Sequence, residues 1–540
     1  MTPTIAILLA LTFVVSVLGL LALVWSIAAN QFSHGQSGAS TIFAAGEVGS
    51  PEDPAAGKDS LPAGEVDQAA EDEARLRRDA DRSSRTPVVT LLGSAVFWLV
   101  LGSLYGLISS IKMHMPEFMG DIEALTFGRV RPMHLNAVAY GWASMAGLGV
   151  AVWLVPRLFK TPLVGARYAT AGAWIWNLGM VLGLTALAAG LSDGEEWLEI
   201  PWQIDILFVI GGALCAVPLL LTVRNRQVEH LYVTSWYLMA ALVWFPFLFF
   251  LANIPYIFPG AAGATVNWWF AHNVLGLWVT PIGVGIAYYL IPKILGKPVI
   301  SYQLSLLGFW TLALFYSQVG IHHLIGGPVP TWLVTLSIVH SVMMAIPVIT
   351  VAINHHGTMI GNFSQLRVSP TLRFVWIGAL MYTVSSLQGS FMALRTVNEV
   401  THFTHYTVGH AHLGMYGFLT FVLFGAIYFI MPRLTGWEWP SRRLITLHFW
   451  LAAIGILIYV VALSVGGWLQ GLALIDGDVP FMDTVRLTLP YLEARTIGGA
   501  LMTVSHLLFA AHFFTVLLRS GKPMDRPTLF RAATSRETSG

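Results

Sequence analysis

The chain has 540 residues, of which 56% are hydrophobic and 11% are charged, and its formal net charge is +1. Soluble globular proteins carry about 25% charged residues, so this composition excludes an ordinary soluble domain and favours a protein with many membrane-spanning segments. No basic tract suits nucleic acid, and the single cysteine, Cys215, excludes a disulfide framework and a zinc–thiolate site.

The first apolar run extends from about Thr4 to Ala28 and is long enough to span a membrane. No basic region precedes it and no small-residue cleavage site follows it, so we interpret residues 1–30 as an N-terminal transmembrane helix and not as a cleaved signal. Residues 31–87 are rich in Gly, Ala, Ser, Asp and Glu and lack hydrophobic periodicity, which predicts a disordered cytoplasmic linker.

Twelve further apolar runs, separated by short loops, follow the linker. They predict an all-α polytopic membrane protein with a twelve-span domain over residues 88–520 and a cytoplasmic tail over residues 521–540. The runs lie near residues 88–112, 132–156, 166–190, 203–223, 231–252, 265–292, 303–326, 331–354, 371–394, 405–431, 445–470 and 496–518.

The loop charges predict the orientation of these spans, because cytoplasmic loops of membrane proteins carry an excess of Lys and Arg. One set of alternate loops is basic, whereas the other set is poorer in Lys and Arg and contains acidic segments such as residues 193–196. We assign the basic set to the cytoplasm, which places the N-terminus outside and the C-terminus inside. The basic loops contain Arg75, Arg85, Arg157, Lys160, Arg167, Arg224, Arg226, Lys293, Lys297, Arg367, Arg433, Arg442, Arg443 and Arg519.

The stretch Thr407–Gly414 contains two histidines within one predicted span, and ionisable groups at membrane depth indicate function. His410 and His412 are about 200° apart around a helix, so they leave it on nearly opposite faces. Two metals, one on each side of the helix, therefore suit this pair better than a single shared metal. The alternative is that both histidines only pack between helices and bond to carbonyl groups.

Histidines from three other spans are expected at the same level as this pair. With a rise of about 1.5 Å per residue, His272 and His410 each lie roughly 10 Å below the outer surface, and Tyr316 lies at the level of His272. The six histidines of the outer half come from four spans, whereas chance would scatter them across the membrane. They are His134, His272, His322, His323, His410 and His412.

These imidazoles suit two kinds of metal centre. His272, His322 and His323 together fit a copper site with an open position. His410 fits the single axial ligand of a five-coordinate, high-spin haem that faces this copper. His412, on the opposite face of its helix, pairs with His134 as the two axial ligands of a six-coordinate, low-spin haem that only transfers electrons.

The order of these motifs resembles subunit I of the haem–copper oxygen reductases, and most closely the catalytic subunit of the cbb(3)-type (C-family) cytochrome c oxidases. The resemblance covers about residues 88–520. It implies the twelve-helix bundle of that subunit, preceded here by one N-terminal transmembrane helix. The segments that are similar to that subunit are Arg131–His134, Tyr288–Lys293, Thr396–Asn398 and Thr407–His412.

The resemblance implies a terminal respiratory oxidase in a bacterial inner membrane. Its cofactors would be two b-type haems, one low-spin and one high-spin, and one copper ion, at which dioxygen is reduced to water while protons are translocated. In the family, the tyrosine placed like Tyr316 is covalently joined to the copper ligand placed like His272, and both are catalytic. No motif for covalent haem attachment is present, so the electrons would come from membrane-anchored c-type cytochrome subunits.

Hydroxyl side chains below Tyr316 are expected to carry protons from the cytoplasmic side. The family's proton channel uses residues placed like Tyr288, Tyr302, Ser305 and Tyr316, although tyrosines at such positions also fit an interfacial belt. Gln388 stands where the family usually has a glutamate, so the proton or charge function of that position is altered here. The N-terminal span, with Gln31-Phe32 and Ile42-Phe43 after it, resembles the small single-span assembly protein of these oxidases, and a simple extra anchor is the alternative.

Two other functions fit part of the pattern. A nitric oxide reductase of the same fold would place non-haem iron at the copper position, but that iron requires a carboxylate, and Asn273 follows His272 instead. A membrane transporter or a metal-handling assembly factor would show matched Gly/Pro interruptions at the midplane, and the sequence has no matched pair.

The remaining histidines receive simpler interpretations. His355-His356 reads as a solvated loop pair at a cytoplasmic end. Four others read as hydrogen-bonded helix residues: His340, His448, His506 and His512.

Overall fold

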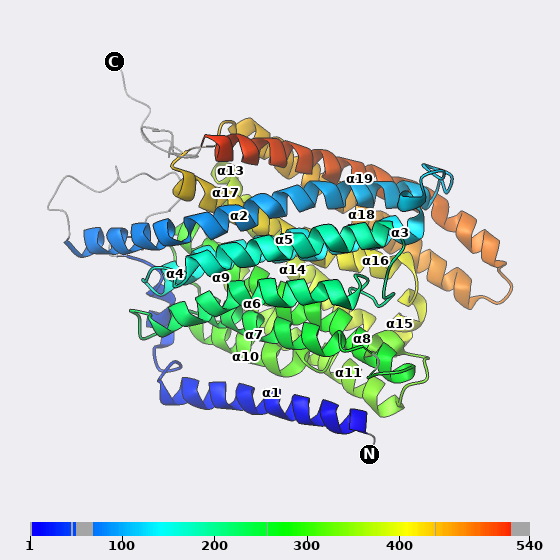
Figure 1. The fold of residues 1–540 in the computed structure, drawn as a ribbon, viewed down its shortest axis with the longest axis horizontal. Coiled ribbons are helices and arrows are strands. Elements are labelled where there is room, and N and C mark those ends of the chain that lie inside the picture. The colour runs from blue at the N-terminus through cyan, green and yellow to red at the C-terminus, as the bar shows by residue number, and fades with distance from the viewer. Residues whose placement is uncertain (1–2, 45–46, 50–67, 256, 438, 520–540) are drawn as a thin grey trace.

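The computed structural model describes residues 3–44, 47–49, 68–255, 257–437 and 439–519, and the described residues form helices that run side by side in one bundle (Figure 1). No β-strand occurs among them, apart from one isolated bridge between Glu195 and Leu198. The α-helices are α1 (Pro3–Ala28), α2 (Gln68–Lys112), α3 (Phe127–Asn136), α4 (Met145–Leu158), α5 (Ala166–Ala188), α6 (Trp202–Arg224), α7 (Val233–Ala252), α8 (Ala261–Val274), α9 (Thr280–Leu295), α10 (Tyr302–Tyr316), α11 (Thr331–Met343), α12 (Ala345–Met359), α13 (Gln365–Val368), α14 (Pro370–Met392), α15 (Arg395–Thr401), α16 (His405–His412), α17 (Phe421–Thr435), α18 (Arg442–Ile475) and α19 (Phe481–Leu518).

The predicted fold class is confirmed. Among the described residues, 11 helical stretches are long and apolar enough to cross a membrane. A twelfth span is made by α14 and α15, which meet at an angle of 102°. Each of these twelve spans overlaps one of the apolar runs predicted between residues 88 and 518.

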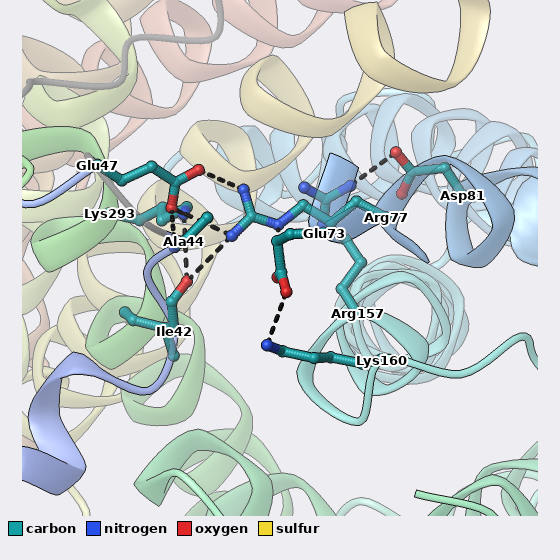
Figure 2. A network of polar contacts seen from close by, with 9 residues as sticks. All are labelled: Ile42, Ala44, Glu47, Glu73, Arg77, Asp81, Arg157, Lys160 and Lys293. Carbon is teal, nitrogen blue, oxygen red and sulfur yellow. Dashed lines mark hydrogen bonds and ion pairs between the residues drawn. The ribbon is translucent and has the colours of Figure 1, made fainter. Parts of the chain in front are cut away.

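The predicted disordered linker over residues 31–87 is wrong for its three described parts, residues 31–44, 47–49 and 68–87. α2 begins at Gln68 and continues through Pro87 into the first span of the bundle, because charged side chains on this extension pair with other loops (Figure 2). Arg157 contacts Asp81 at 2.7 Å, and Lys160 contacts Glu73 at 2.6 Å. Residues 31–44 also pack against the bundle. The rest of the predicted linker, residues 45–46 and 50–67, and the predicted tail, residues 521–540, lie outside the described residues.

The last two helices are longer than predicted. α19 begins at Phe481, although the apolar run predicted its start near residue 496, and α18 continues to Ile475. The two helices form a hairpin that extends beyond the rest of the bundle at one end (Figure 1). An ion pair between Asp483 and Arg486, at 2.7 Å, supports the first turn of α19, which the apolar pattern alone does not reveal.

Two glycines of α18 allow this helix to approach the segment that carries His410 and His412. A Cβ atom at Gly467 would lie 2.0 Å from the main-chain nitrogen of Tyr406, and one at Gly471 would lie 1.8 Å from the carbonyl oxygen of Val400. Both contacts are with main-chain atoms, so a larger residue would require movement of the backbone at the start of α16 for Gly467 and in α15 for Gly471.

We predict that Gly467→Ala destabilises the protein by about 1–3 kcal/mol or more, because the added methyl group overlaps the main chain of Tyr406. The same displacement is expected to weaken haem binding at His410 and His412 of α16. Thermal unfolding and the optical spectrum of the purified protein measure both effects. Gly499→Ala in α19 is the matched control, since a Cβ atom there has no neighbour within 4 Å. Equal melting temperatures for the two variants would contradict this account of the packing.

Candidate metal centres

Three of the predicted ligand histidines are followed closely by a π-helical segment. The segment Ala137–Ser144 follows His134, Leu275–Val279 follows His272, and Leu413–Thr420 follows His412 directly. π-Helical turns are rare and occur frequently at functional sites, where the wider turn changes the direction of the side chains around it. The sequence pattern did not reveal these segments, because a hydrophobic span reads the same whether its turns are α or π.

The structure brings His272, His322 and His323 together. One ring nitrogen from each of the three side chains can be chosen so that all three lie within 4.8 Å of one another. The ring centroid of His272 is 4.9 Å from that of His322 and 5.4 Å from that of His323. Three converging imidazoles without a carboxylate are a donor set that suits copper.

A break in the helix, and not a continuous helix, presents His322 and His323. The predicted span over residues 303–326 ends as an α-helix at Tyr316, and a 3-10 turn over Ile321–Leu324 carries the two histidines. Gly320 before this turn has a φ of +112°, and a Cβ atom there would lie 2.7 Å from the carbonyl oxygen of Trp268. A glycine is therefore required for the chain to fold back against α8, the helix of His272.

Hydrogen bonds orient His322 toward the cluster. Its Nδ1 lies 3.2 Å from the hydroxyl of Ser337 and 3.1 Å from that of Ser341, which leaves Nε2 available as a metal ligand. The Nδ1 atom of His272 is buried and has no hydrogen-bond partner. A buried imidazole nitrogen without a partner is unfavourable unless a metal or water satisfies it, so the cluster fits a metal ion.

Tyr316 lies next to His272, as the depth argument predicted. Their ring centroids are 5.3 Å apart. Gly276, four residues after His272, allows this approach, because a Cβ atom there would lie 1.6 Å from Cε1 of Tyr316. The ring of Tyr316 therefore lies on the bare backbone of the π-helical segment that follows His272.

His410 lies close to the three-histidine cluster, and electrostatic interactions link it with His272, His322 and His323. Its Nδ1 lies 3.3 Å from Oε1 of Gln388, so the side-chain amide accepts a hydrogen bond and leaves Nε2 free to bind iron. The sequence identified Gln388 as a departure from the family, and the structure shows that this residue contacts the predicted haem ligand.

His134 and His412 face each other on the other side of α16. Their ring centroids are 6.3 Å apart and their planes differ by 12°. Each Nδ1 is bonded to a main-chain carbonyl, that of Gly102 at 2.8 Å for His134 and that of Val408 at 2.9 Å for His412. A bond from Nδ1 to a carbonyl oxygen is typical of metal-ligating histidines, because it fixes the tautomer and the direction of Nε2.

A tyrosine and an arginine that the sequence did not single out lie beside His412. The hydroxyl of Tyr459 is 3.2 Å from Nε2 of His412, and Nε of the buried Arg495 donates to the same hydroxyl at 3.0 Å. Tyr459 thus contacts the nitrogen predicted to bind iron, and its hydroxyl would have to turn away when a haem is bound.

The four residues predicted for proton transfer are buried or partly buried below the cluster. Tyr288, Tyr302 and Ser305 are at most 1% exposed. Nδ2 of Asn354 donates to the hydroxyl of Tyr288 at 3.2 Å, and the hydroxyl of Ser305 donates to the carbonyl of Tyr302 at 2.6 Å. These burial values do not fit tyrosines of an interfacial belt.

Further polar side chains between these residues were missed in the sequence. The hydroxyls of Tyr237 and Tyr382 are buried and have no hydrogen-bond partner, and the ring of Tyr237 is 5.9 Å from that of Tyr288. His355 is also buried, and neither of its ring nitrogens has a hydrogen-bond partner. Its ring centroid lies 4.4 Å from that of Tyr288. Its interpretation as a solvated loop residue is therefore wrong, because α12 continues past it. Unpartnered buried polar atoms such as these are usually satisfied by internal water.

The four histidines that were expected to be hydrogen-bonded helix residues do have such partners, which confirms that interpretation. They are His340 with the carbonyl of Phe315, His448 with Tyr428, His506 with Ser103 and Tyr416, and His512 with the main-chain nitrogen of Ser441.

A buried carboxyl group lies at the predicted outer end of the bundle. Glu199 is 5% exposed, and Nδ2 of Asn136, two residues after His134, donates to its Oε2 at 2.9 Å. Burial raises the pKa of Glu199 to about 7, although the hydrogen bond from Asn136 acts in the opposite direction.

Comparisons with known proteins agree with this arrangement. Residues 86–501 match the family described as Cytochrome C and Quinol oxidase polypeptide I. The chain is 32% identical over 446 residues to the Cbb3-type cytochrome c oxidase subunit CcoN1 of Stutzerimonas stutzeri, covering 80% of this chain and 94% of that protein. It is 31% identical to Cytochrome c oxidase subunit 1 of Rhodobacter capsulatus, covering 79% and 85%.

A solved structure has the same fold. A chain from the cryo-EM structure of a heme-copper terminal oxidase dimer superposes with a TM-score of 0.65 at 16% identity, covering 83% of this chain and 85% of that chain.

We predict that Gln388→Glu lowers the midpoint potential of the haem that we expect His410 to bind. A carboxylate accepts a stronger hydrogen bond from Nδ1 than an amide does, which favours the oxidised iron by about 1 kcal/mol. Gln388→Ala removes the acceptor and is expected to shift the potential in the opposite direction. Redox titration of the high-spin haem and resonance Raman measurement of its iron–histidine stretch test both variants, and shifts of the same sign would contradict this function of Gln388.

We predict that Glu199→Gln stabilises the protein above pH 7 but not below pH 5. A raised pKa means that the folded state binds the proton more tightly than the unfolded state, so stability declines as the pH rises from about 4.5 to about 7. The gain from the substitution is on the order of 2–3 kcal/mol at pH 8. The stability gain is measured from the melting temperatures of the wild type, Glu199→Gln and the exposed control Glu117→Gln at pH 5 and pH 8. A gain of equal size at both pH values would count against the raised pKa of Glu199.

Proposed function

Because the chain belongs to the Cytochrome C and Quinol oxidase polypeptide I family and is a terminal oxidase subunit that binds haem and copper, we propose that its outer-half histidines form the site of dioxygen reduction. The observation that supports this proposal most strongly is the cluster of His272, His322 and His323 with Tyr316 beside it.

The proposed ligands follow from the orientation of the imidazoles. His272, His322 and His323 would hold one copper ion, and His410 would hold a high-spin haem on the near side of α16. His134 and His412 would hold a low-spin haem on the far side. We propose b-type haem at both positions, since no motif for covalent attachment is present. When bound, these metals supply the electrons that reduce dioxygen and allow its O–O bond to break.

The chain's own residues would orient the ligands and supply protons. The carbonyls of Gly102 and Val408 hold His134 and His412, and Gln388 holds His410. Tyr316, whose ring lies beside that of the proposed copper ligand His272, would donate a proton and an electron from its hydroxyl. The buried hydroxyls of Tyr288, Tyr302 and Ser305, with water between them, would return the proton from the cytoplasmic side and support proton translocation.

The electrons would arrive from membrane-anchored c-type cytochrome subunits at the outer face. We propose a multi-pass position in a bacterial inner membrane, with the N-terminus outside and the C-terminus in the cytoplasm. The loop charges support this orientation, and Figure 2 shows that basic residues of these loops, Arg157, Lys160 and Lys293, lie near one another.

A nitric oxide reductase fits the site less well. Among the described residues, the group that could hold this metal consists of three histidines and includes no Asp or Glu. Non-haem iron is usually held with at least one carboxylate, so the donor set favours copper and dioxygen.

We predict that Tyr316→Phe leaves the haem spectrum nearly intact but reduces oxygen consumption by at least about 100-fold, because it removes the hydroxyl and keeps the ring on Gly276. The measurements are optical spectroscopy and oxygen-electrode turnover of the purified complex. Normal turnover would refute the function proposed for Tyr316, and a spectrum without two b-type haems in the wild type would refute the proposed cofactors.

A further inference from the structure

The N-terminal segment Gln31–Ala44, which precedes the part of the chain that matches the oxidase family, binds the bundle through two glutamines. Nε2 of Gln31 donates to the carbonyl of Glu229 at 3.1 Å, and its Oε1 accepts from the main-chain nitrogen of Leu231 at 2.8 Å. Gln36 forms the same pair of bonds with a second loop, to the carbonyl of Val299 at 2.6 Å and from the main-chain nitrogen of Tyr302 at 3.1 Å. Each side-chain amide thus both donates from its nitrogen and accepts at its oxygen, so the contact between the segment and the two loops is specific.

Ion pairs fasten the chain just after this segment. The carboxylate of Glu47 contacts Arg77 and Lys293, and Nζ of Lys293 also donates to the carbonyl of Ile42 at 3.2 Å (Figure 2). Burial acts to raise the pKa of Glu47, but the hydrogen bond from Arg77 and the charge of Lys293 outweigh it and lower this pKa to about 2. The carboxylate therefore stays ionised, and the segment stays anchored, at any pH at which the protein works.

Between these anchors the segment places a histidine over the end of the predicted proton path. The ring of His34 is partly exposed and lies 4.3 Å from the ring of His230. Nε2 of His230 is 2.7 Å from the hydroxyl of Tyr302, which is buried. Gly38 makes this packing possible, since a Cβ atom there would lie 2.7 Å from the ring of Tyr302 and 2.8 Å from Nε2 of His230.

His230 is placed to receive a proton on one side and to release it on the other. Its Nδ1 is buried and has no hydrogen-bond partner, whereas Nε2 is bonded to Tyr302. Burial, and next the nearby His34, lower the pKa of His230 to about 4, so this imidazole is neutral and keeps one nitrogen free to accept.

The surroundings of His230 are polar. A pocket lies beside it and is lined by charged side chains of α2, of the last turn of α4 and of the loop that follows. They are Glu73, Arg77, Arg157 and Lys160.

We propose that the segment Gln31–Ala44 forms the outermost part of the proton path, with His34 passing protons from solution through His230 to Tyr302. This inference rests on the proposed function, because it extends the path through Tyr302, Ser305, Tyr288 and Tyr316. In each transfer, His34 gives a proton to Nδ1 of His230, the proton on Nε2 of His230 moves to the hydroxyl oxygen of Tyr302, and that hydroxyl releases its own proton inward along the path. His34 then takes a new proton from solution, and a flip of the His230 ring restores its starting tautomer, so no oxidant or reductant is consumed.

The test uses the full-length chain in the purified oxidase complex. His34→Ala is expected to lower oxygen consumption by about 10-fold, with unchanged haem spectra and melting temperature, because a surface proton donor is lost. Added imidazole should restore most of the turnover, which a purely structural defect would not allow. Ser33→Ala is the matched control, since its exposed hydroxyl only donates to the carbonyl of Asn30. His34→Ala with the turnover of Ser33→Ala, or without a response to imidazole, would overturn the proposal.

A second variant tests the step from His230 to Tyr302. Gly38→Ala inserts a methyl group against both rings and is expected to lower turnover in a way that imidazole does not restore. Normal turnover of this variant would refute that step. Neither result depends on the Tyr316→Phe experiment: if the wild type reduces dioxygen and Tyr316→Phe does not, the proposed function stands whatever the His34 variant does.

Discussion

The architecture depends on holding three imidazoles inside an apolar bundle so that one ring nitrogen from each lies within 4.8 Å of the other two. Such a cluster is unfavourable without a metal, because buried ring nitrogens lose their water and gain no partner. The fold reaches this geometry by local departures from regular helix: a π-helical segment after His272 and a glycine-led 3-10 turn before His322. The same departures place Tyr316 against Gly276, so the proposed copper ligands and the tyrosine are positioned together.

Hydrogen-bond partners orient the rings of the predicted ligand histidines. The predicted ligands His134, His410 and His412 each have Nδ1 bonded to a carbonyl or amide oxygen, which fixes the ring and leaves Nε2 directed away from the helix. His448 instead packs against Phe424 and bonds to Tyr428. His340, a packing residue, also has Nδ1 bonded to a main-chain carbonyl, so the convergence of the imidazole rings, and not the hydrogen-bond pattern alone, marks the predicted ligands.

Much of the fold could be predicted from the sequence, because long apolar runs and loop charges follow directly from membrane physics. The level of His272, Tyr316 and His410 could also be predicted, since helical rise converts residue number into depth. The docking of residues 31–44 and the contact of Gln388 with His410 could not, because both depend on side-chain pairing between segments far apart in the chain. Composition likewise could not distinguish the N-terminal extension of α2 from a disordered linker. That extension is held by ion pairs with Arg157 and Lys160, which are distant in the sequence.

The most direct test of the central claim is X-ray absorption at the copper edge of the purified complex. We expect one copper per chain with three imidazole nitrogen ligands, and loss of that copper in His322→Ala while both haem spectra remain. Copper that is absent from the wild type, or a coordination shell that is unchanged when His322 is removed, would contradict the account.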